Sequence, residues 1–265
     1  MIKMKKSQIA AQLYCFRDFL QTEHGIADTF RRLNAMGYEA VQLTASLPES
    51  VTPEKLLKLL TDHGLKAVSS HEGGAKIFNE TDRIIEKHQA LGINHLAYPG
   101  PHLSPTGVGE VIDFAEKLNA LALKFKEHGI TLAYHNHHIE FRRFEGKMML
   151  ELIYEHAPAL QGEIDTHWVQ RGGGDPVHWI KRLAGRMDVI HLKDYGVDTE
   201  VIKDLWSSQP VMKPVGSGNL EWDEIIPAAE QTGVKVFVVE HDKDILDPFD
   251  SFARSFAFLA ENFCR

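Results

Sequence analysis

Short runs of almost entirely apolar residues recur along the chain, and six of them follow an amphipathic stretch that ends at a glycine. The six runs lie at residues 38–43, 65–70, 93–98, 130–134, 187–192 and 234–239, after Gly37, Gly64, Gly92, Gly129, Gly185 and Gly233. Two more runs, at 9–16 and 160–164, complete a series of eight. Continuous apolar runs are typical of parallel strands covered on both faces, and a glycine in this position favours the left-handed cap of a preceding helix.

Amphipathic helices are predicted between these strands, at residues 53–63, 84–91, 111–128, 148–156, 177–183, 225–231 and 248–263. Eight strands alternating with helices over about 260 residues predict an α/β fold, a single (β/α)8 TIM barrel that spans residues 1–265 as one domain. An open doubly wound sheet is the alternative. It is less favoured because the segment LYCFRD at 13–18 provides no glycine-rich phosphate loop after the first strand.

Polar residues able to do chemistry follow the predicted strands, at the edge where the active site of a barrel lies. They are Gln42; Ser69, His71 and Glu72; His135, His137 and Glu140; Glu163, Asp165, His167 and Trp168; His191, Lys193 and Asp194; and Glu240 and Asp242. Side chains alternate along a strand, so His135 and His137 share a face with Ala133, and His191 and Lys193 share a face with Val189. Small or branched residues would fill the barrel interior, and polar residues would lie at the C-terminal ends of its strands.

Composition narrows the class of protein. The chain has 265 residues, of which 43% are hydrophobic and 25% charged, as in soluble globular proteins. A net charge of −8 argues against sequence-independent binding of nucleic acid, and no apolar run reaches the length of a membrane span. Two cysteines without a CxxC motif fit reduced thiols, so we expect a cytoplasmic protein.

The polar residues at five strand ends point together to a bound cation. A lone histidine or carboxylate at a strand end is more often structural, but desolvated carboxylates that converge are costly unless they share a positive charge. A mixed set of carboxylates and imidazoles suits a divalent ion such as Mn²⁺, Zn²⁺, Co²⁺ or Fe²⁺. The absence of thiolates from the set disfavours a structural zinc site.

Several short motifs share their order and spacing with a known family. They are YHNHHIEF at 134–141, DTHW at 165–168, GDP at 174–176, HLKD at 191–194 and GSGNLEW at 216–222, and the similarity runs from residue 12 to residue 242. With these motifs the chain resembles the xylose-isomerase-like TIM barrels known as sugar phosphate isomerases/epimerases. Ketose 3-epimerases, inosose and dehydroshikimate dehydratases and endonuclease IV belong to the same superfamily.

The resemblance implies a metal-ligand set of Glu, Asp, His and Glu from the last four strands. Asp165, His191 and Glu240 match the last three places. The first place is open: Glu140 is favoured, and His135 is the alternative ligand or a substrate contact. Gln42 departs from the family, because many relatives have Glu there. Its neutral amide could bind a substrate hydroxyl but could not act as a base.

The family activity implied is removal of a proton next to the carbonyl of a keto-sugar or related polyol, through a metal-stabilised enediolate. We therefore expect an isomerase or epimerase. A dehydratase or lyase acting on a keto-inositol or 3-keto-glycoside is the alternative, since it would use the same metal site. Glu240 would be both ligand and acid/base, and Lys193 would stabilise the enolate oxygen or transfer a proton. A salt bridge from Lys193 to Asp194 or Asp165 is its structural alternative.

Substrate contacts are expected from His71, His135, His137 and Gln42, with Trp168 as an apolar wall for the sugar or as core packing. The expected partner is a small carbohydrate, with no nucleic acid and no membrane. No cluster of Arg and Gly indicates a phosphate group. Relatives are often dimers or tetramers, and the sequence leaves the oligomeric state of this chain open.

Two rival functions are less favoured. An endonuclease IV-like repair enzyme needs Asp-x-His after the seventh strand, where this chain has KDYG at 193–196. A non-catalytic sugar-binding barrel would be indicated by missing ligands, and here the ligand set looks complete.

Overall fold

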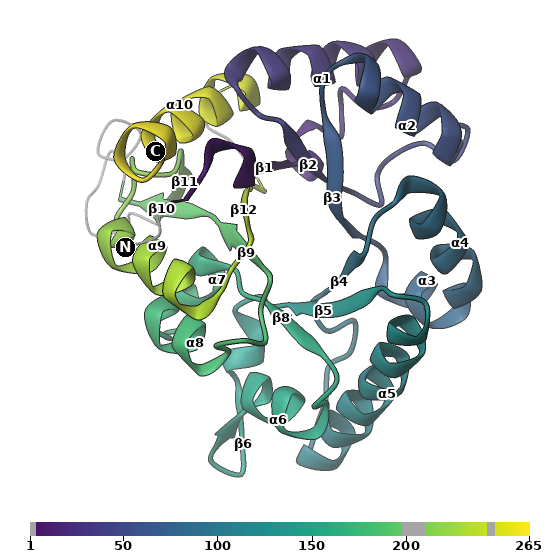
Figure 1. Cartoon of the computed structure of the whole chain (residues 1–265). Helices are drawn as coiled ribbons and strands as arrows, with labels where there is room; N and C mark the ends of the chain where they lie inside the picture. The colour runs from purple at the N-terminus through teal and green to yellow at the C-terminus, as the bar shows by residue number, and fades with distance from the viewer. Residues whose placement is uncertain (1–3, 198–209, 243–246) are drawn as a thin grey trace.

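Eight parallel strands form a nearly closed barrel ringed by helices (Figure 1). The computed structural model describes residues 4–197, 210–242 and 247–265. The sheet order is β8-β5-β4-β3-β2-β1-β12-β9. The strands are β1 (Ile9–Gln12), β2 (Ala40–Leu43), β3 (Lys66–His71), β4 (His95–Pro99), β5 (Thr131–His135), β8 (Gln161–Glu163), β9 (Val189–Leu192) and β12 (Val236–Val239). The predicted (β/α)8 barrel is confirmed.

The two ends of this sheet meet between β8 and β9. A parallel bridge pairs Asp165 with His191, and the His191 N–H donates to the Ile164 carbonyl over 2.8 Å. Nearer the start of β8, the Gly162 N–H donates to the Arg186 carbonyl, also over 2.8 Å. The closing contact therefore lies beside two of the predicted metal ligands.

Helices cover the outside of the barrel, and the seven predicted ones are present. The helices are α1 (Glu23–Met36), α2 (Pro53–Asp62), α3 (Gly74–Asn79), α4 (Thr81–Leu91), α5 (Val108–Glu127), α6 (Met149–His156), α7 (Thr166–Arg171), α8 (Pro176–Arg182), α9 (Trp222–Thr232) and α10 (Pro248–Asn262). The sequence pattern predicted that a helix ends at Gly37, where α1 ends, but not where α1 begins, and it did not predict α3 or α7. The last two have six residues each, too few for a helical period to show. Among the described residues, no helix is long and apolar enough to cross a bilayer.

Short 3-10 helices and hairpins lie in the segments that connect the main elements. They are the 3-10 helices η1 (Lys6–Gln8), η2 (Leu13–Phe16) and η3 (Ile139–Phe141), and two antiparallel hairpins, β6 (Arg143–Phe144) with β7 (Lys147–Met148) and β10 (Asp194–Gly196) with β11 (Val211–Lys213). The first strand is shorter than predicted. It ends at Gln12 because the Gln12 side chain accepts a hydrogen bond from the Tyr14 N–H and turns the chain into η2.

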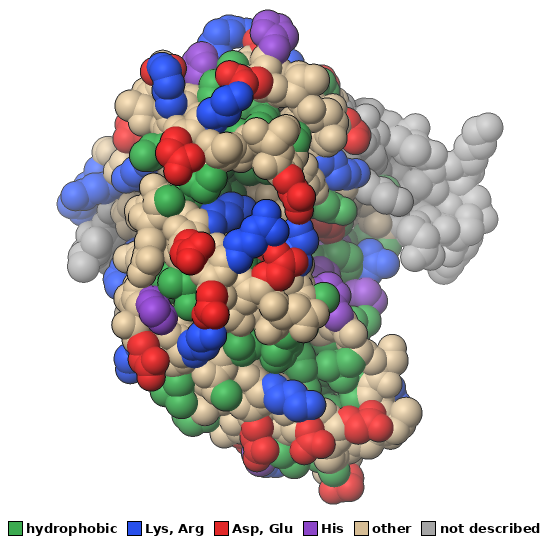
Figure 2. All heavy atoms as spheres, turned by 90° about the vertical axis from the view of Figure 1, so that its right-hand side faces the viewer, with side chains coloured by type: hydrophobic (Ala, Val, Ile, Leu, Met, Phe, Trp, Pro, Cys, Tyr) green, Lys and Arg blue, Asp and Glu red, His purple; other side chains and the backbone are tan. Residues whose placement is uncertain are grey.

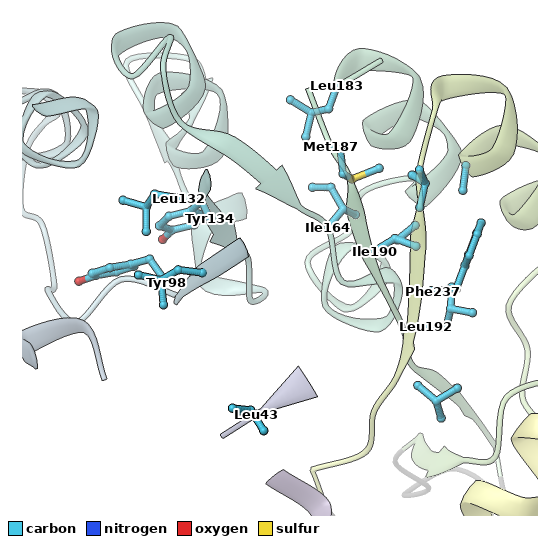
Figure 3. Packing of buried hydrophobic residues seen from close by; sticks show 14 of the residues in the cluster. Leu43, Tyr98, Leu132, Tyr134, Ile164, Leu183, Met187, Ile190, Leu192 and Phe237 are labelled. Carbon is cyan, nitrogen blue, oxygen red and sulfur yellow. The ribbon is translucent and has the colours of Figure 1, made fainter. Parts of the chain in front are cut away.

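The alternation of side chains separates the barrel interior from the layer under the helices. Inside, Ala10, Ala40, Val189 and Val238 form a small cluster of their own. Outside, residues such as Ile190, Leu192 and Phe237 pack toward the helices (Figure 3). Two residues beyond the inner cluster, the same four strands carry the buried polar residues Gln12, Gln42, His191 and Glu240. The polar residues expected at the C-terminal ends of the strands therefore lie there.

All six glycines predicted to end helices have a positive φ, from 67° to 108°. We predict that Gly37→Ala destabilises the protein more than Gly129→Ala. Both variants force an L-residue into left-handed backbone, which costs about 1–2 kcal/mol. A Cβ at Gly37 would also lie 2.4 Å from the buried Phe256 ring, whereas one at Gly129 meets nothing within 4 Å. Overpacking adds about 1–3 kcal/mol.

Denaturant unfolding of the two variants measures the difference directly. Equal losses of unfolding free energy in the two variants would contradict the packing of α10 against the turn at Gly37.

Candidate active site

Four buried side chains converge at the mouth of the barrel. They are His135 from β5, Asp165 just after β8, His191 from β9 and Glu240 just after β12. One ligand atom from each lies within 4.8 Å of the others. All four are at most 4% exposed. Asp165 also caps α7, since its Oδ1 accepts from the Trp168 N–H over 2.9 Å, which fixes its direction.

The structure places His135, and not Glu140, beside the other three residues. After β5 the chain turns through η3, where Glu140 bonds to Tyr134 and His137 and is not part of the cluster. There the Tyr134 hydroxyl donates to Glu140 Oε1 and the His137 N–H donates to Oε2, each over 3.0 Å. Glu140 is fully buried in this position, and burial raises its pKa to about 7. The candidate donor set is thus two imidazoles and two carboxylates.

Two atoms of this set are buried without a hydrogen-bond partner among the described residues. They are His135 Nδ1 and Asp165 Oδ2, although Asp165 Oδ2 is ion-paired with the ammonium of Lys193 at 3.1 Å. Buried polar atoms are nearly always satisfied, and an unsatisfied one costs about 1–3 kcal/mol. A ligand nitrogen without a hydrogen bond, beside a carboxylate oxygen that already faces a positive charge, fits a divalent cation of the borderline type. The residues present therefore fit the expected metal ion.

Lys193 supplies a positive charge inside the same cluster. The side chain is about 1% exposed, and its Nζ lies 3.1 Å from Asp165 Oδ2, Glu240 Oε2 and Asp242 Oδ1. Burial alone would lower the pKa of Lys193, but the three carboxylates raise it well above its usual value. Of the two salt bridges that the sequence left open, the one to Asp165 forms. Asp194 instead accepts from the Gly216 and Gly218 N–H groups and from Trp222 Nε1.

His191 lies between Glu240 and Gln42 and bonds to both. Its Nδ1 donates to Glu240 Oε2 and its Nε2 to Gln42 Oε1, each over 2.7 Å. Burial lowers the pKa of His191, but Glu163 and Glu240 outweigh burial and raise it to about 10. The imidazole is therefore charged when no metal is bound. Since a metal ligand must be a neutral imidazole, binding at His191 requires the release of a proton.

Glu163 lies directly under the cluster, and the sequence-based site prediction omitted it. Its Oε1 accepts from His71 Nε2 over 2.6 Å and lies 3.0 Å from His191 Nε2. Burial would raise its pKa, but the imidazoles of His191 and His71 hold it well below the usual range. Glu163 stands two residues before Asp165 on the same strand face, so parity alone could have identified it. With His71, His135 and His191 it forms a second group able to hold a cation.

A cavity of about 460 Å³ opens above these residues. Its lining includes His71, His135, His137, Trp168, Glu240 and Asp242, and its volume is typical of a small-molecule site. Four of the five predicted substrate contacts therefore face the cavity.

Gln42 is the predicted contact that does not face the cavity. It is fully buried below the floor, where its Nε2 donates to Ser69 Oγ and Glu163 Oε2 over 2.9 and 3.0 Å. Its Oε1 accepts from Gln12 Nε2 as well as from His191. The amide is thus engaged on all sides by the protein and serves to hold His191 and Glu163.

Aromatic and imidazole rings form one wall of the cavity. The Trp168 ring lies 5.4 Å from His137 and 5.1 Å from His138 between centroids, and Lys193 Nζ lies 5.2 Å from its centre. Burial, helped by the charge of Lys193, lowers the pKa of His137 to about 3. His137 is therefore a neutral ring with one donor and one acceptor, which suits a hydroxyl group.

The chain belongs to the xylose isomerase-like TIM barrel family, since residues 30–262 match the profile of that family. Three solved structures illustrate the shared fold. A sugar phosphate isomerase/epimerase from Parabacteroides distasonis is 20% identical with a TM-score of 0.79, and the match covers 98% of this chain and 95% of that one. A probable 3-DHS dehydratase from Bacillus anthracis is 17% identical with a TM-score of 0.73, covering 98% and 100%.

The third is a xylose isomerase-like TIM barrel protein from Mycobacterium smegmatis in complex with magnesium, 15% identical with a TM-score of 0.72, covering 97% of each chain. No curated protein sequence matches the chain significantly.

We predict that Lys193→Met destabilises the metal-free protein by about 3–5 kcal/mol, the usual effect of removing one partner of a buried ion pair. Asp165 and Glu240 would lose the ammonium that lies between them, so Mn²⁺ should stabilise this variant more than it stabilises the wild type. Thermal unfolding in EDTA and in Mn²⁺ checks both effects. Lys235→Met is the control, because the Lys235 pair with Asp188 is exposed and contributes about 0–1 kcal/mol. A smaller Mn²⁺ effect in Lys193→Met would contradict the shared site.

Glu140 predicts a pH dependence of stability. Between its usual pKa of 4.5 and its raised value of about 7, the folded protein keeps a proton that the unfolded chain releases. Its contribution to stability therefore falls as pH rises through this window, by up to about 3 kcal/mol. Glu140→Gln removes the titrating group, so its unfolding free energy should fall less steeply than that of the wild type. Urea unfolding from pH 4.5 to 7.5 tests this, with the exposed Glu127→Gln as control. Parallel curves for all three proteins would refute it.

Proposed function

We propose that the protein is a divalent-metal-dependent sugar isomerase or epimerase that removes a proton next to the carbonyl of a keto-sugar. One observation carries the proposal: the ligand atoms of His135, Asp165, His191 and Glu240 lie within 4.8 Å of one another below a cavity of about 460 Å³. Membership of the family supports the same class of activity.

In this proposal the same four residues hold the metal ion. When bound, the ion supplies positive charge at the carbonyl oxygen, where negative charge develops as the proton leaves. The excess of carboxylates over positive charges in the cluster supports a cation rather than an anion at this place.

Glu240 is the proposed acid/base. It lines the cavity. Burial raises its pKa, but Lys193 and His191 hold it well below the usual range, so the carboxylate is ionised and can accept a proton. Return of that proton to the neighbouring carbon gives an isomer, whereas an epimer requires a second group that donates a proton to the opposite face of the same carbon. Lys193 Nζ, 3.1 Å from Glu240 Oε2, donates toward the oxygen that gains charge.

His71, His137 and Trp168 orient the sugar. His71 donates through Nε2 to Glu163, which leaves its Nδ1 for a hydroxyl group. The neutral ring of His137 offers a second polar contact. The Trp168 ring provides an apolar surface for a C–H face of the sugar. These contacts are made by groups that the barrel already holds in place, which is what orientation of a small substrate requires.

We predict that Glu240→Gln lowers kcat at least 10³-fold on a keto-sugar substrate while the fold is retained, because general acid/base catalysis contributes about 10²–10⁴-fold and one ligand carboxylate is also lost. Exchange of the proton next to the carbonyl with D₂O, followed by NMR, is the measurement. Glu261→Gln, on the surface at the end of α10, should exchange at the wild-type rate. Full exchange activity in Glu240→Gln would end the acid/base assignment.

Metal dependence is tested with the same exchange reaction. EDTA should abolish exchange, and Mn²⁺ or Co²⁺ should restore it. The products identify the reaction, since an isomer, an epimer or a dehydrated sugar is formed from the same first step. Exchange that survives complete removal of metal would contradict the proposed site.

A further inference from the structure

A second group of ligand atoms lies beside the proposed metal site. One ligand atom from each of its members lies within 4.8 Å of the others, and the members are His71, His135, Glu163 and His191. His135 and His191 also belong to the first group, which Asp165 and Glu240 complete. The second group therefore has two residues of its own, His71 and Glu163, and the proposed reaction uses neither as a metal ligand.

The carboxylate of Glu163 is the centre of the second group. Its Oε1 lies 2.6 Å from His71 Nε2, 3.0 Å from His191 Nε2 and 3.6 Å from His135 Nδ1. In a tetrahedral site with metal–ligand bonds of about 2.1 Å, two ligand atoms lie about 3.4 Å apart. The three observed separations lie on either side of that value, so small shifts of the side chains bring all four atoms to one ion.

One nitrogen of this group is buried and unsatisfied. His135 Nδ1 has no hydrogen-bond partner among the described residues, and the His135 side chain is 3% exposed. Buried polar atoms are nearly always paired, and the separation from Glu163 Oε1 is too long for a hydrogen bond. A cation with bonds of about 2.1 Å to both atoms spans this separation. The second group thus has a vacant donor aimed at its own carboxylate.

Glu163 is paired with imidazoles and with no stronger cation. Among the residues that the structure describes, it forms no ion pair with a lysine or arginine, and its fourth imidazole neighbour is His95, 3.7 Å from Oε2. The first group differs, because the Lys193 ammonium lies 3.1 Å from both Asp165 Oδ2 and Glu240 Oε2. A buried carboxylate needs positive charge close by. A metal ion in the second group supplies it to Glu163.

Packing holds the three imidazoles of the second group together. The ring centroids of His71 and His135 lie 4.8 Å apart, those of His71 and His191 5.1 Å apart, and those of His135 and His191 4.5 Å apart. On the outer face drawn in Figure 2, by contrast, histidine side chains lie at several separate places among charged and apolar ones. His71 and His135 also line the active-site cavity, which gives an ion access to the group.

The two groups differ in the kind of donor that they offer. The first has two imidazoles and two carboxylates, and the second has three imidazoles and one carboxylate. Imidazole nitrogen suits zinc, whereas carboxylate oxygen suits manganese and magnesium. Zinc also accepts a four-coordinate tetrahedral set of histidine and carboxylate ligands. The donors of the second group therefore favour Zn²⁺ more than those of the first.

We propose that the second group is a zinc site, at a different position from the proposed catalytic metal. A zinc ion there takes His135 and His191 away from the first group, so the two sites cannot both be filled with their full ligand sets. Zn²⁺ therefore excludes Mn²⁺ from the first group without occupying its position. The inference rests on the proposed function only for the position of Mn²⁺, since zinc binding does not depend on which reaction the protein catalyses.

Two substitutions separate the groups. His71→Gln removes a ligand of the second group only, and the new amide can still donate to Glu163. Asp165→Asn removes a ligand of the first group only, and its Oδ1 can still accept from the Trp168 N–H. His102→Gln is the matched control, because His102 is an exposed histidine that lines the same cavity and belongs to neither group.

Calorimetry on the metal-free proteins measures the Kd of Zn²⁺ and, separately, of Mn²⁺. Loss of an outer neighbour of a ligand weakens metal binding about 10–100-fold, and loss of a ligand weakens it more. We therefore expect His71→Gln to weaken Zn²⁺ binding at least about tenfold more than Mn²⁺ binding, and Asp165→Asn to do the reverse. His102→Gln should bind both ions as the wild type does. Equal weakening of both ions in each variant, or wild-type Zn²⁺ affinity in His71→Gln, would overturn the proposal.

Anomalous X-ray diffraction from wild-type crystals locates each ion even if a variant does not fold. A zinc peak between Glu163 and the imidazoles of His71 and His135 supports the proposal. A zinc peak between Asp165 and Glu240, or no bound zinc, rejects it. The proposed function is judged separately, by whether Mn²⁺ restores proton exchange after EDTA. A zinc peak in the second group without any Mn²⁺-dependent exchange keeps the zinc site and rejects the proposed function.

Discussion

Compensation of buried negative charge is the constraint on which the mouth of this barrel depends. Glu163, Asp165 and Glu240 are all at most 4% exposed, and isolated carboxylates in such places are too costly to persist. The protein compensates them with one ammonium, Lys193, and one imidazolium, His191. These two cations determine where each carboxylate can lie. The geometry that a metal would use is therefore already held by charge before any metal binds.

The barrel makes this arrangement possible through its strand register. Val238 pairs with His191 across β12 and β9, and Ala11 pairs with Val239 across β1 and β12. Small and branched side chains fill the interior, and the next inward positions along the strands carry polar side chains. Charged groups from strands distant in sequence thus meet without entering the apolar core. The core outside the strands and the polar layer inside them are separated by the alternation of side chains alone.

The same alternation explains how much the sequence could predict. Apolar runs and glycines identified all eight strands, and parity directed His135, His191 and Glu240 inward. The alternation of side chains does not predict where a residue points in the loop beyond a strand. Glu140 lies on a 3-10 turn whose direction depends on the Tyr134 hydroxyl, so its position required the three-dimensional structure. Gln42 faces inward as its parity requires. Its role as a partner of His191, rather than of substrate, depends on a contact 149 residues away in the sequence.

Charge also constrains what can enter the site. The cluster contains four carboxylates, those of Glu163, Asp165, Glu240 and Asp242. They face one ammonium, Lys193, and one imidazolium, His191. The metal-free cluster therefore has an excess of two negative charges. A divalent ion adds two positive charges, but its binding removes the proton of His191, so one negative charge still remains. A phosphate group, with nearly two further negative charges at neutral pH, would meet repulsion here unless free arginine or lysine side chains faced it. Three basic side chains of a neighbouring cavity beside α4, Lys76, Arg83 and Lys87, are paired with acids. Among the described residues, the charge of the cluster therefore disfavours a phosphate group placed directly beside it.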